Sequence, residues 1–174
     1  MLEMPSLIEL FRIEILHEST SLTVLDGDEI VYLARSATKR VMSIGLSVGS
    51  RLPSYCTSMG RVLLAALSAE EFSNYLDRVV LKPLTPHTIT DKTLFGDVIA
   101  QVRFDGYALI DEELELGLRS IAVQVSTAQG IVIAGMNVGV HVARASTADL
   151  VHRVLPILRK GAASLGRMVG ATHS

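Results

Sequence analysis

The chain has no tryptophan, one cysteine and no surplus of basic residues. In 174 residues Cys56 is the single cysteine, and the formal net charge is −2. A lone thiol excludes an internal disulfide and is typical of a reducing compartment. Because there is no basic excess to contact phosphates, we do not expect this segment to bind nucleic acid by itself.

Long apolar runs and the common cofactor signatures are also missing. No stretch approaches the roughly 18 consecutive apolar residues of a membrane helix, and Glu3 lies where a signal peptide would be basic. We therefore expect a cytoplasmic protein with no membrane contact. The sequence has no His-x-x-x-His pair, Cys/His cluster or glycine-rich phosphate loop, so we expect no metal and no cofactor.

What is present is a composition typical of one folded domain. Hydrophobic residues make up 49% and charged residues 20% of the chain, and 174 residues are enough to enclose a core. We interpret residues 1–174 as a single domain without repeats or a flexible linker.

Apolar residues at helical spacing predict five helices. A capping box that starts at Ser68 should begin one of them, Gly106 should end the next, and Pro156 should kink the last or mark a boundary in it. The expected helices cover residues 5–17, 54–67, 68–79, 91–105 and 146–169.

Alternating segments and an Asp26-Gly27 turn predict strands between these helices. The strands occur in pairs, which favours an α+β fold with one six-stranded antiparallel sheet flanked by helices. Gly49 and Pro53 should break the third strand. The expected strands cover residues 21–26, 30–36, 42–48, 107–110, 120–126 and 131–138.

Function is expected to concentrate between Asp111 and Val125, where an acidic loop turns through Gly117 into a strand. One face of this strand carries Ile121, Val123 and Val125 and should enter a core. The other face carries Ser120, Ala122 and Gln124. Such a face leaves room for a ligand or a packed helix.

The start of the helix near Ser58-Met59-Gly60 is a candidate anion site, because free backbone N–H groups and the helix dipole favour a carboxylate. The alternative is that Ser54 or Thr57 simply caps the helix. Arg40 and Arg51 could each supply charge to a ligand, although each also fits a surface position.

Two catalytic interpretations remain open. The carboxylates of Asp111, Glu112 and Glu113 could bind a metal or act as general acid and base, but a solvated loop with Arg119 as an ion-pair partner is the commoner explanation of such a cluster. Cys56 could be a nucleophile with His87 or His141 as base, or a buried helix cysteine.

Two segments resemble a known family. LPSYCTSMGRVLLAAL, followed about fifty residues later by DEELELGLRSIAVQV, is similar to the effector-binding domain of IclR-type bacterial transcriptional regulators. The segments RVMSIGLSVGSRLPSYCTSMGRVLLA, LKPLTPHTITD and MNVGVHVAR look most like the PcaR/PcaU/PobR group, which controls aromatic-acid catabolism through the β-ketoadipate pathway. The resemblance covers nearly the whole chain.

The resemblance implies a GAF-like domain that binds a small organic acid, forms a homodimer or homotetramer, and contacts DNA only through an upstream winged helix-turn-helix domain. We expect that domain to be absent from this chain. The implied effector is an aromatic or dicarboxylic acid such as protocatechuate, 4-hydroxybenzoate or β-ketoadipate.

The resemblance also implies where the effector binds. Family members that bind keto acids use positions that match Ser58, Met59, Ile110, Ser120, Asn137 and Gly139, with apolar walls at Ile44, Leu52 and Leu118. Here Met59 replaces a small residue, Ile110 an aspartate, and Asn137 and Gly139 two serines, which argues against a glyoxylate or pyruvate sensor. The candidate ligand-binding set is Ile44, Leu52, Ser58, Met59, Ile110, Asp111, Leu118, Ser120, Asn137, Gly139 and His141.

No reaction is expected from such a domain. Two other hypotheses stay open: a small-molecule enzyme that uses Cys56 or the acidic loop, and a GAF-like oligomerisation module whose pocket is closed by Met59 and Ile110.

Overall fold

The computed structural model describes residues 18–36 and 45–171. Six strands form one sheet in the order β3-β2-β1-β6-β5-β4, and each neighbouring pair is antiparallel. The strands are β1 (Ser19–Asp26), β2 (Glu29–Ser36), β3 (Arg51–Pro53), β4 (Ala108–Asp111), β5 (Leu118–Ser126) and β6 (Val132–His141). The expected α+β fold with a six-stranded antiparallel sheet is therefore confirmed.

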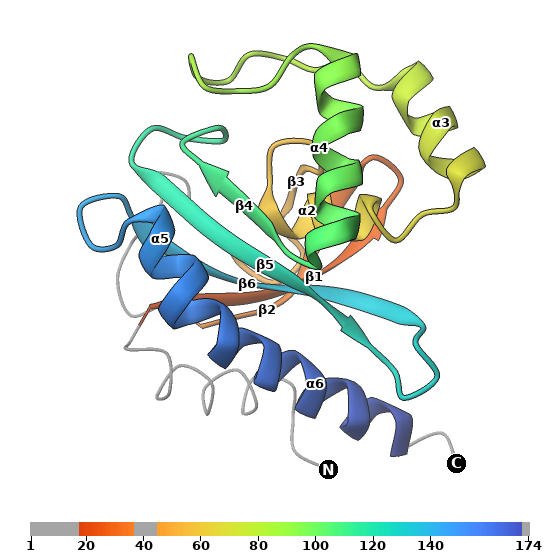
Figure 1. Ribbon diagram of the computed structural model, residues 1–174, viewed down its shortest axis with the longest axis vertical. Helices are drawn as coiled ribbons and strands as arrows, with labels where there is room; N and C mark the ends of the chain where they lie inside the picture. The colour runs from red at the N-terminus through yellow and green to blue at the C-terminus, as the bar shows by residue number, and fades with distance from the viewer. Residues whose placement is uncertain (1–17, 37–44, 172–174) are drawn as a thin grey trace.

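The helices lie on both faces of this sheet (Figure 1). In chain order they are α2 (Ser58–Leu64), α3 (Ala69–Arg78), α4 (Lys92–Asp105), α5 (Thr147–Asp149), the π-helical segment η1 (Leu150–Val154) and α6 (Leu155–Ala171). The expected helix over residues 5–17 lies outside the described residues.

Local capping explains where α3 and α4 begin and end. The Ser68 hydroxyl accepts from the Glu71 N–H, and the Glu71 carboxylate accepts from the Ser68 N–H, so both halves of the expected capping box form. Asp91 caps α4, and Gly106 ends it in the left-handed conformation with φ of 76°.

Each face of the sheet covers its own hydrophobic core. Ile121, Val123 and Val125 face η1 and α6 in one core. Ala122 belongs to the other core, with α2 and the buried face of α4. The predicted division of β5 into two faces is thus correct, and the small-residue face receives a helix (Figure 1).

Glycine allows α2 to approach the sheet closely. A Cβ on Gly135 of β6 would lie 3.2 Å from Cβ of Met59 and 3.3 Å from its carbonyl oxygen, closer than most side chains tolerate. All seven residues of α2 are buried as a result. The start of α2 is therefore held directly over the middle strands.

Two predicted elements differ most from the expectation. The predicted strand 42–48 is wrong in its described part: residues 45–48 form a loop and turn, and β3 lies further on at Arg51–Pro53. Gly49, with φ of 89°, turns the chain, and its N–H donates to the Tyr32 carbonyl at 2.8 Å. The predicted helix 54–67 shortens to α2 because Thr57 caps it.

The last helix changes its hydrogen bonding just before Pro156. The Leu155 N–H bonds to the Leu150 carbonyl, five residues back, and regular α-helix follows. The expected boundary at Pro156 is confirmed, since proline has no N–H to continue the ladder. Two apolar residues of these helices face solvent: Met168 of α6 is 41% exposed, and Leu94 of α4 is 51% exposed.

Candidate functional site

A narrow cavity lies between the sheet and the start of α2. The empty space between its walls is about 450 Å³, which includes a part open to solvent. The cavity itself is small, with a volume of about 30 Å³. We call this space the central cavity. Its walls are Ser19, Ser21, Tyr32, Arg35, Cys56, Thr57, Ser58, Met59, Ile110, Leu114, Leu118, Ser120, Asn137 and Gly139.

Two rows of residues across the sheet form most of the polar floor. In the first row Ser19 lies opposite Gly139, which lies opposite Ser120, with Ile110 next. In the second row Arg35 lies opposite Ser21, which lies opposite Asn137. Side chains two residues apart on a strand share a face, so both rows point to the same side.

The helix start closes the first row. The Ser120 hydroxyl donates to the Ser58 hydroxyl at 2.9 Å. Thr57 caps α2, because its hydroxyl accepts from the Gly60 N–H at 3.2 Å. The capping alternative is therefore correct for Thr57, and a helix of seven residues offers little dipole for an anion.

The positive charge at the central cavity comes from Arg35. Its guanidinium donates to the Ser21 hydroxyl at 3.4 Å, and its central carbon lies 6.0 Å from the Tyr32 ring centroid. Within the described residues no carboxylate forms an ion pair with it. Arg51, by contrast, binds Asp26 and Glu29 on the surface, while Arg40 lies outside the described residues.

The apolar wall of the central cavity includes two groups that stay protonated. Burial raises the pKa of the Cys56 thiol to about 12, although the Arg61 charge lowers it. Burial likewise raises the pKa of Tyr32 to about 12, against the opposing charge of Arg35. A thiol with so high a pKa is a poor nucleophile at neutral pH.

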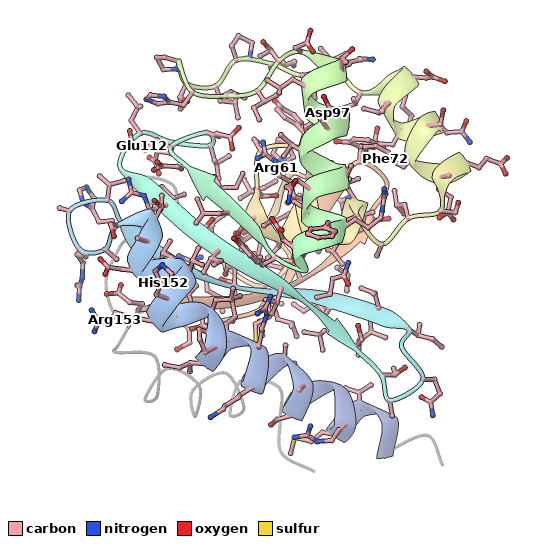
Figure 2. The ribbon with its side chains drawn as sticks, in the orientation of Figure 1. Arg61, Phe72, Asp97, Glu112, His152 and Arg153 are labelled. Carbon is pink, nitrogen blue, oxygen red and sulfur yellow. The ribbon has the colours of Figure 1, made fainter. Side chains whose placement is uncertain are left out.

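Ion pairs hold the acidic loop, which we take as residues 111–117 including the last residue of β4, against the rest of the domain. Glu113 binds the Arg61 guanidinium at 2.8 Å, with side-chain exposures of 9% and 3%. Figure 2 shows Arg61 beside α4, where it lies 5.7 Å from the Phe95 ring centroid. Asp111 binds Arg119 at 2.8 Å, as the solvated-loop interpretation expected. These pairs hold Leu114 in the cavity wall.

No metal-binding cluster of three His, Cys, Asp or Glu side chains occurs among residues 18–36 and 45–171. In the same part of the chain no helix is both long and apolar enough to span a bilayer.

The structure brings most of the candidate residues together. Those that line the central cavity are Ser58, Met59, Ile110, Leu118, Ser120, Asn137 and Gly139. Ile44 lies outside the described residues.

Three candidates lie away from the central cavity. Leu52 of β3 is buried in the hydrophobic core, and Asp111 forms an ion pair with Arg119. His141 is exposed at the end of β6, where its Nδ1 accepts from the Ala143 N–H at 3.1 Å. None of the three is among the described residues that line the central cavity, and each makes another contact in the protein.

Sequence reasoning missed the β1 and β2 side of the floor. Ser19, Ser21, Tyr32 and Arg35 line the central cavity. Ser19 and Ser21 pair with Gly139 and Asn137 of β6, which lie far along the chain. The one available signal was the alternation of Ser19 and Ser21 with Thr20 and Leu22, which extends β1 toward its start.

The fold and this enclosed, polar-floored site are those of a ligand-sensing domain. Residues 4–167 match the family model described as bacterial transcriptional regulator IclR, C-terminal. The chain belongs to the IclR family and corresponds to its C-terminal domain, which confirms the resemblance.

The relatives belong to the expected group. The Pca regulon regulatory protein of Pseudomonas putida is 50% identical over 144 residues, which cover 82% of this chain and 50% of the relative. The p-hydroxybenzoate hydroxylase transcriptional activator of Acinetobacter baylyi is 42% identical over 154 residues, 86% of this chain and 57% of the relative. The chain thus spans about half the length of these curated relatives.

A solved structure has the same fold. It is a double mutant of the inducer-binding domain of the transcription factor PobR from Acinetobacter, in complex with 3-hydroxybenzoic acid. It superposes with a TM-score of 0.87 at 37% identity, covering 96% of this chain and 99% of that chain.

Proposed function

We propose that this chain is the effector-sensing part of a transcriptional regulator and binds a small aromatic or dicarboxylic acid in the central cavity. The observation that carries the proposal is Arg35, a cation that lines an otherwise neutral cavity and has no carboxylate partner among the described residues. A partly buried charge is costly to leave unpaired, so the site favours an anion.

The rest of the cavity fits an aromatic acid of the hydroxybenzoate and protocatechuate class. Arg35 and the neighbouring Ser21 and Asn137 suit a carboxylate, while Met59 and Leu118 offer apolar contacts to a ring. The names of the relatives point to the same chemistry, since one regulates the Pca regulon and another is an activator of p-hydroxybenzoate hydroxylase.

Binding of an aromatic acid requires the walls of the central cavity to separate, because the cavity volume is only about 30 Å³. Ligand binding would therefore shift the protein toward a more open arrangement of α2 and the acidic loop. A ligand shifts such an equilibrium only by its difference in affinity for the two states. We propose that this shift is read by an upstream DNA-binding domain, within a cytoplasmic homodimer or homotetramer that performs no reaction.

The narrowness of the cavity favours one second candidate, an oligomerisation module that binds no ligand. Met59 and Ile110, each 1% exposed, would then be ordinary core residues. No comparable observation favours a thiol enzyme, since burial keeps Cys56 protonated.

Calorimetric titration separates these candidates. We expect protocatechuate, 4-hydroxybenzoate or β-ketoadipate to bind the wild-type chain, and Arg35→Met to weaken that binding about tenfold or more, the value of one charge-assisted hydrogen bond. Arg51→Met, which removes an arginine from the surface, is the matched control and should not change affinity.

Each other outcome has a definite meaning. No heat from any of the acids at millimolar concentration would favour the oligomerisation module. Equal affinity in wild type and Arg35→Met would place the carboxylate elsewhere and remove the observation on which the proposal depends.

A further inference from the structure

The hydroxyl of Ser19 is buried at the central cavity. Ser19 is 4% exposed, lines the cavity, and its Oγ has no hydrogen-bond partner among residues 18–36 and 45–171. Most buried hydroxyls in proteins are satisfied, so an unmet one that faces a cavity is suited to a group that arrives with a ligand or a water.

The floor beside Ser19 is open. Gly139 lies between Ser19 and Ser120 in one row, and the two serines are two strand spacings, about 10 Å, apart. Among the residues that the structure describes, a Cβ on Gly139 would have one neighbour within 4 Å, the Leu118 Cδ1 atom at 3.9 Å. The absent side chain leaves a gap over which a flat ring can lie.

The polar groups around this gap differ in the hydrogen bonds that they already make. Ser120 already donates to Ser58 at 2.9 Å, and Arg35 offers charge from the second row. Ser19 offers a neutral hydroxyl, which can donate and accept. A carboxylate is best met by Arg35, so Ser19 is left for an uncharged polar substituent.

We propose that Ser19 is a specificity-determining residue that hydrogen-bonds a ring hydroxyl of the ligand and so selects hydroxylated aromatic acids over benzoate. This inference rests on the proposed function, because it needs an aromatic acid in the central cavity with its carboxylate toward Arg35. A ligand without the hydroxyl covers Ser19 and leaves its buried hydroxyl unpaired, and discrimination follows from that cost.

Thr20 supplies a matched control on the same strand. Its hydroxyl is also buried, at 0% exposure, and also lacks a partner. Thr20 lies opposite Val138, which belongs to the core on the α6 face, and it does not line the central cavity. Thr20→Val therefore removes a buried hydroxyl from the face of β1 that points away from the central cavity.

The experiment measures the ratio of the benzoate Kd to the Kd of the tightest of 3-hydroxybenzoate, 4-hydroxybenzoate and protocatechuate. We expect the wild type to prefer a hydroxylated acid, Ser19→Ala to reduce the ratio about threefold to tenfold, and Thr20→Val to leave it unchanged. Both variants should unfold at or above the wild-type temperature, because neither breaks a protein hydrogen bond.

The opposing outcomes separate this inference from the proposed function. A wild-type ratio near one, an unchanged ratio in Ser19→Ala, or equal losses for benzoate and the hydroxylated acid would overturn the role of Ser19 while leaving acid sensing intact. Failure of the wild type to bind any of the four aromatic acids, while it still binds β-ketoadipate, would overturn the role of Ser19 and leave acid sensing intact. Failure to bind β-ketoadipate as well would overturn both.

Discussion

The buried pair of Arg61 and Glu113 should be the most stability-sensitive charge contact described. Arg61 donates to Glu113 at 2.8 Å and to the Tyr55 carbonyl at 2.9 Å. The Glu113 carboxylate also accepts from the Ile89 N–H at 3.3 Å. Arg61→Met keeps most of the side-chain volume but leaves the Glu113 charge buried without its cation.

The size of the loss follows from burial. Removing one partner of a buried ion pair typically costs about 3 to 5 kcal/mol, since the remaining charge stays desolvated. For a chain of this length about 1 kcal/mol corresponds to roughly 2 to 4 °C in the midpoint. Thermal unfolding followed by circular dichroism should therefore show the Arg61→Met midpoint lowered by about 6 to 20 °C.

An exposed pair provides the control. Arg78 binds Asp28 at 2.6 Å, with side-chain exposures of 52% and 38%, and such pairs contribute little in water. Arg78→Met should leave the midpoint close to that of wild type. Adding Glu113→Leu to Arg61→Met should recover part of the loss. Equal midpoints for the two single variants would refute the reasoning.

Three further predictions concern the cavity, helix packing and pH. Ser120→Leu should fill the floor and reduce effector affinity at least tenfold while the circular dichroism spectrum is retained; full affinity would place the site elsewhere. Gly166→Ala should lower the unfolding midpoint, because its Cβ would overlap the Ser126 carbonyl oxygen of β5. Gly96→Ala should raise it slightly, because its Cβ would make an ordinary contact of 3.9 Å with the Leu76 Cδ1 atom; midpoints that move together would contradict this. Burial raises the pKa of Cys56 from 9.0 and that of Tyr32 from 10.0, each to about 12. The contribution of these two groups to the free energy of unfolding is therefore complete below pH 9 and is lost between pH 9 and 12. Urea titrations that show no decline in stability over that pH range would contradict this.

Local chemistry made much of the fold predictable. The capping box at Ser68 and the left-handed Gly106 determine helix ends through nearby atoms, so sequence alone located α3 and α4 within one or two residues. The alternation of β5 predicted correctly which face meets a core. The open face at Ser120 correctly indicated where a helix or a cavity would lie.

The other half of the site depends on contacts between distant segments. Arg35, Ser21 and Asn137 become neighbours because β1 pairs with both β2 and β6, and no local pattern encodes that order. The misplaced third strand has a similar cause, since Arg51 pairs with Val31 of β2 while residues 45–48 form a loop and a turn. Ser19 was missed because the alternation that extends β1 to its start is weak, since Ser19, Thr20 and Ser21 are all polar.

The most direct test of the account is a crystal structure of this chain with 4-hydroxybenzoate or protocatechuate. The account predicts a ring over Gly139 in the central cavity, its carboxylate within hydrogen-bond distance of the Arg35 guanidinium and a ring hydroxyl on Ser19. A ligand bound outside this cavity, or one whose carboxylate avoids Arg35, would contradict it.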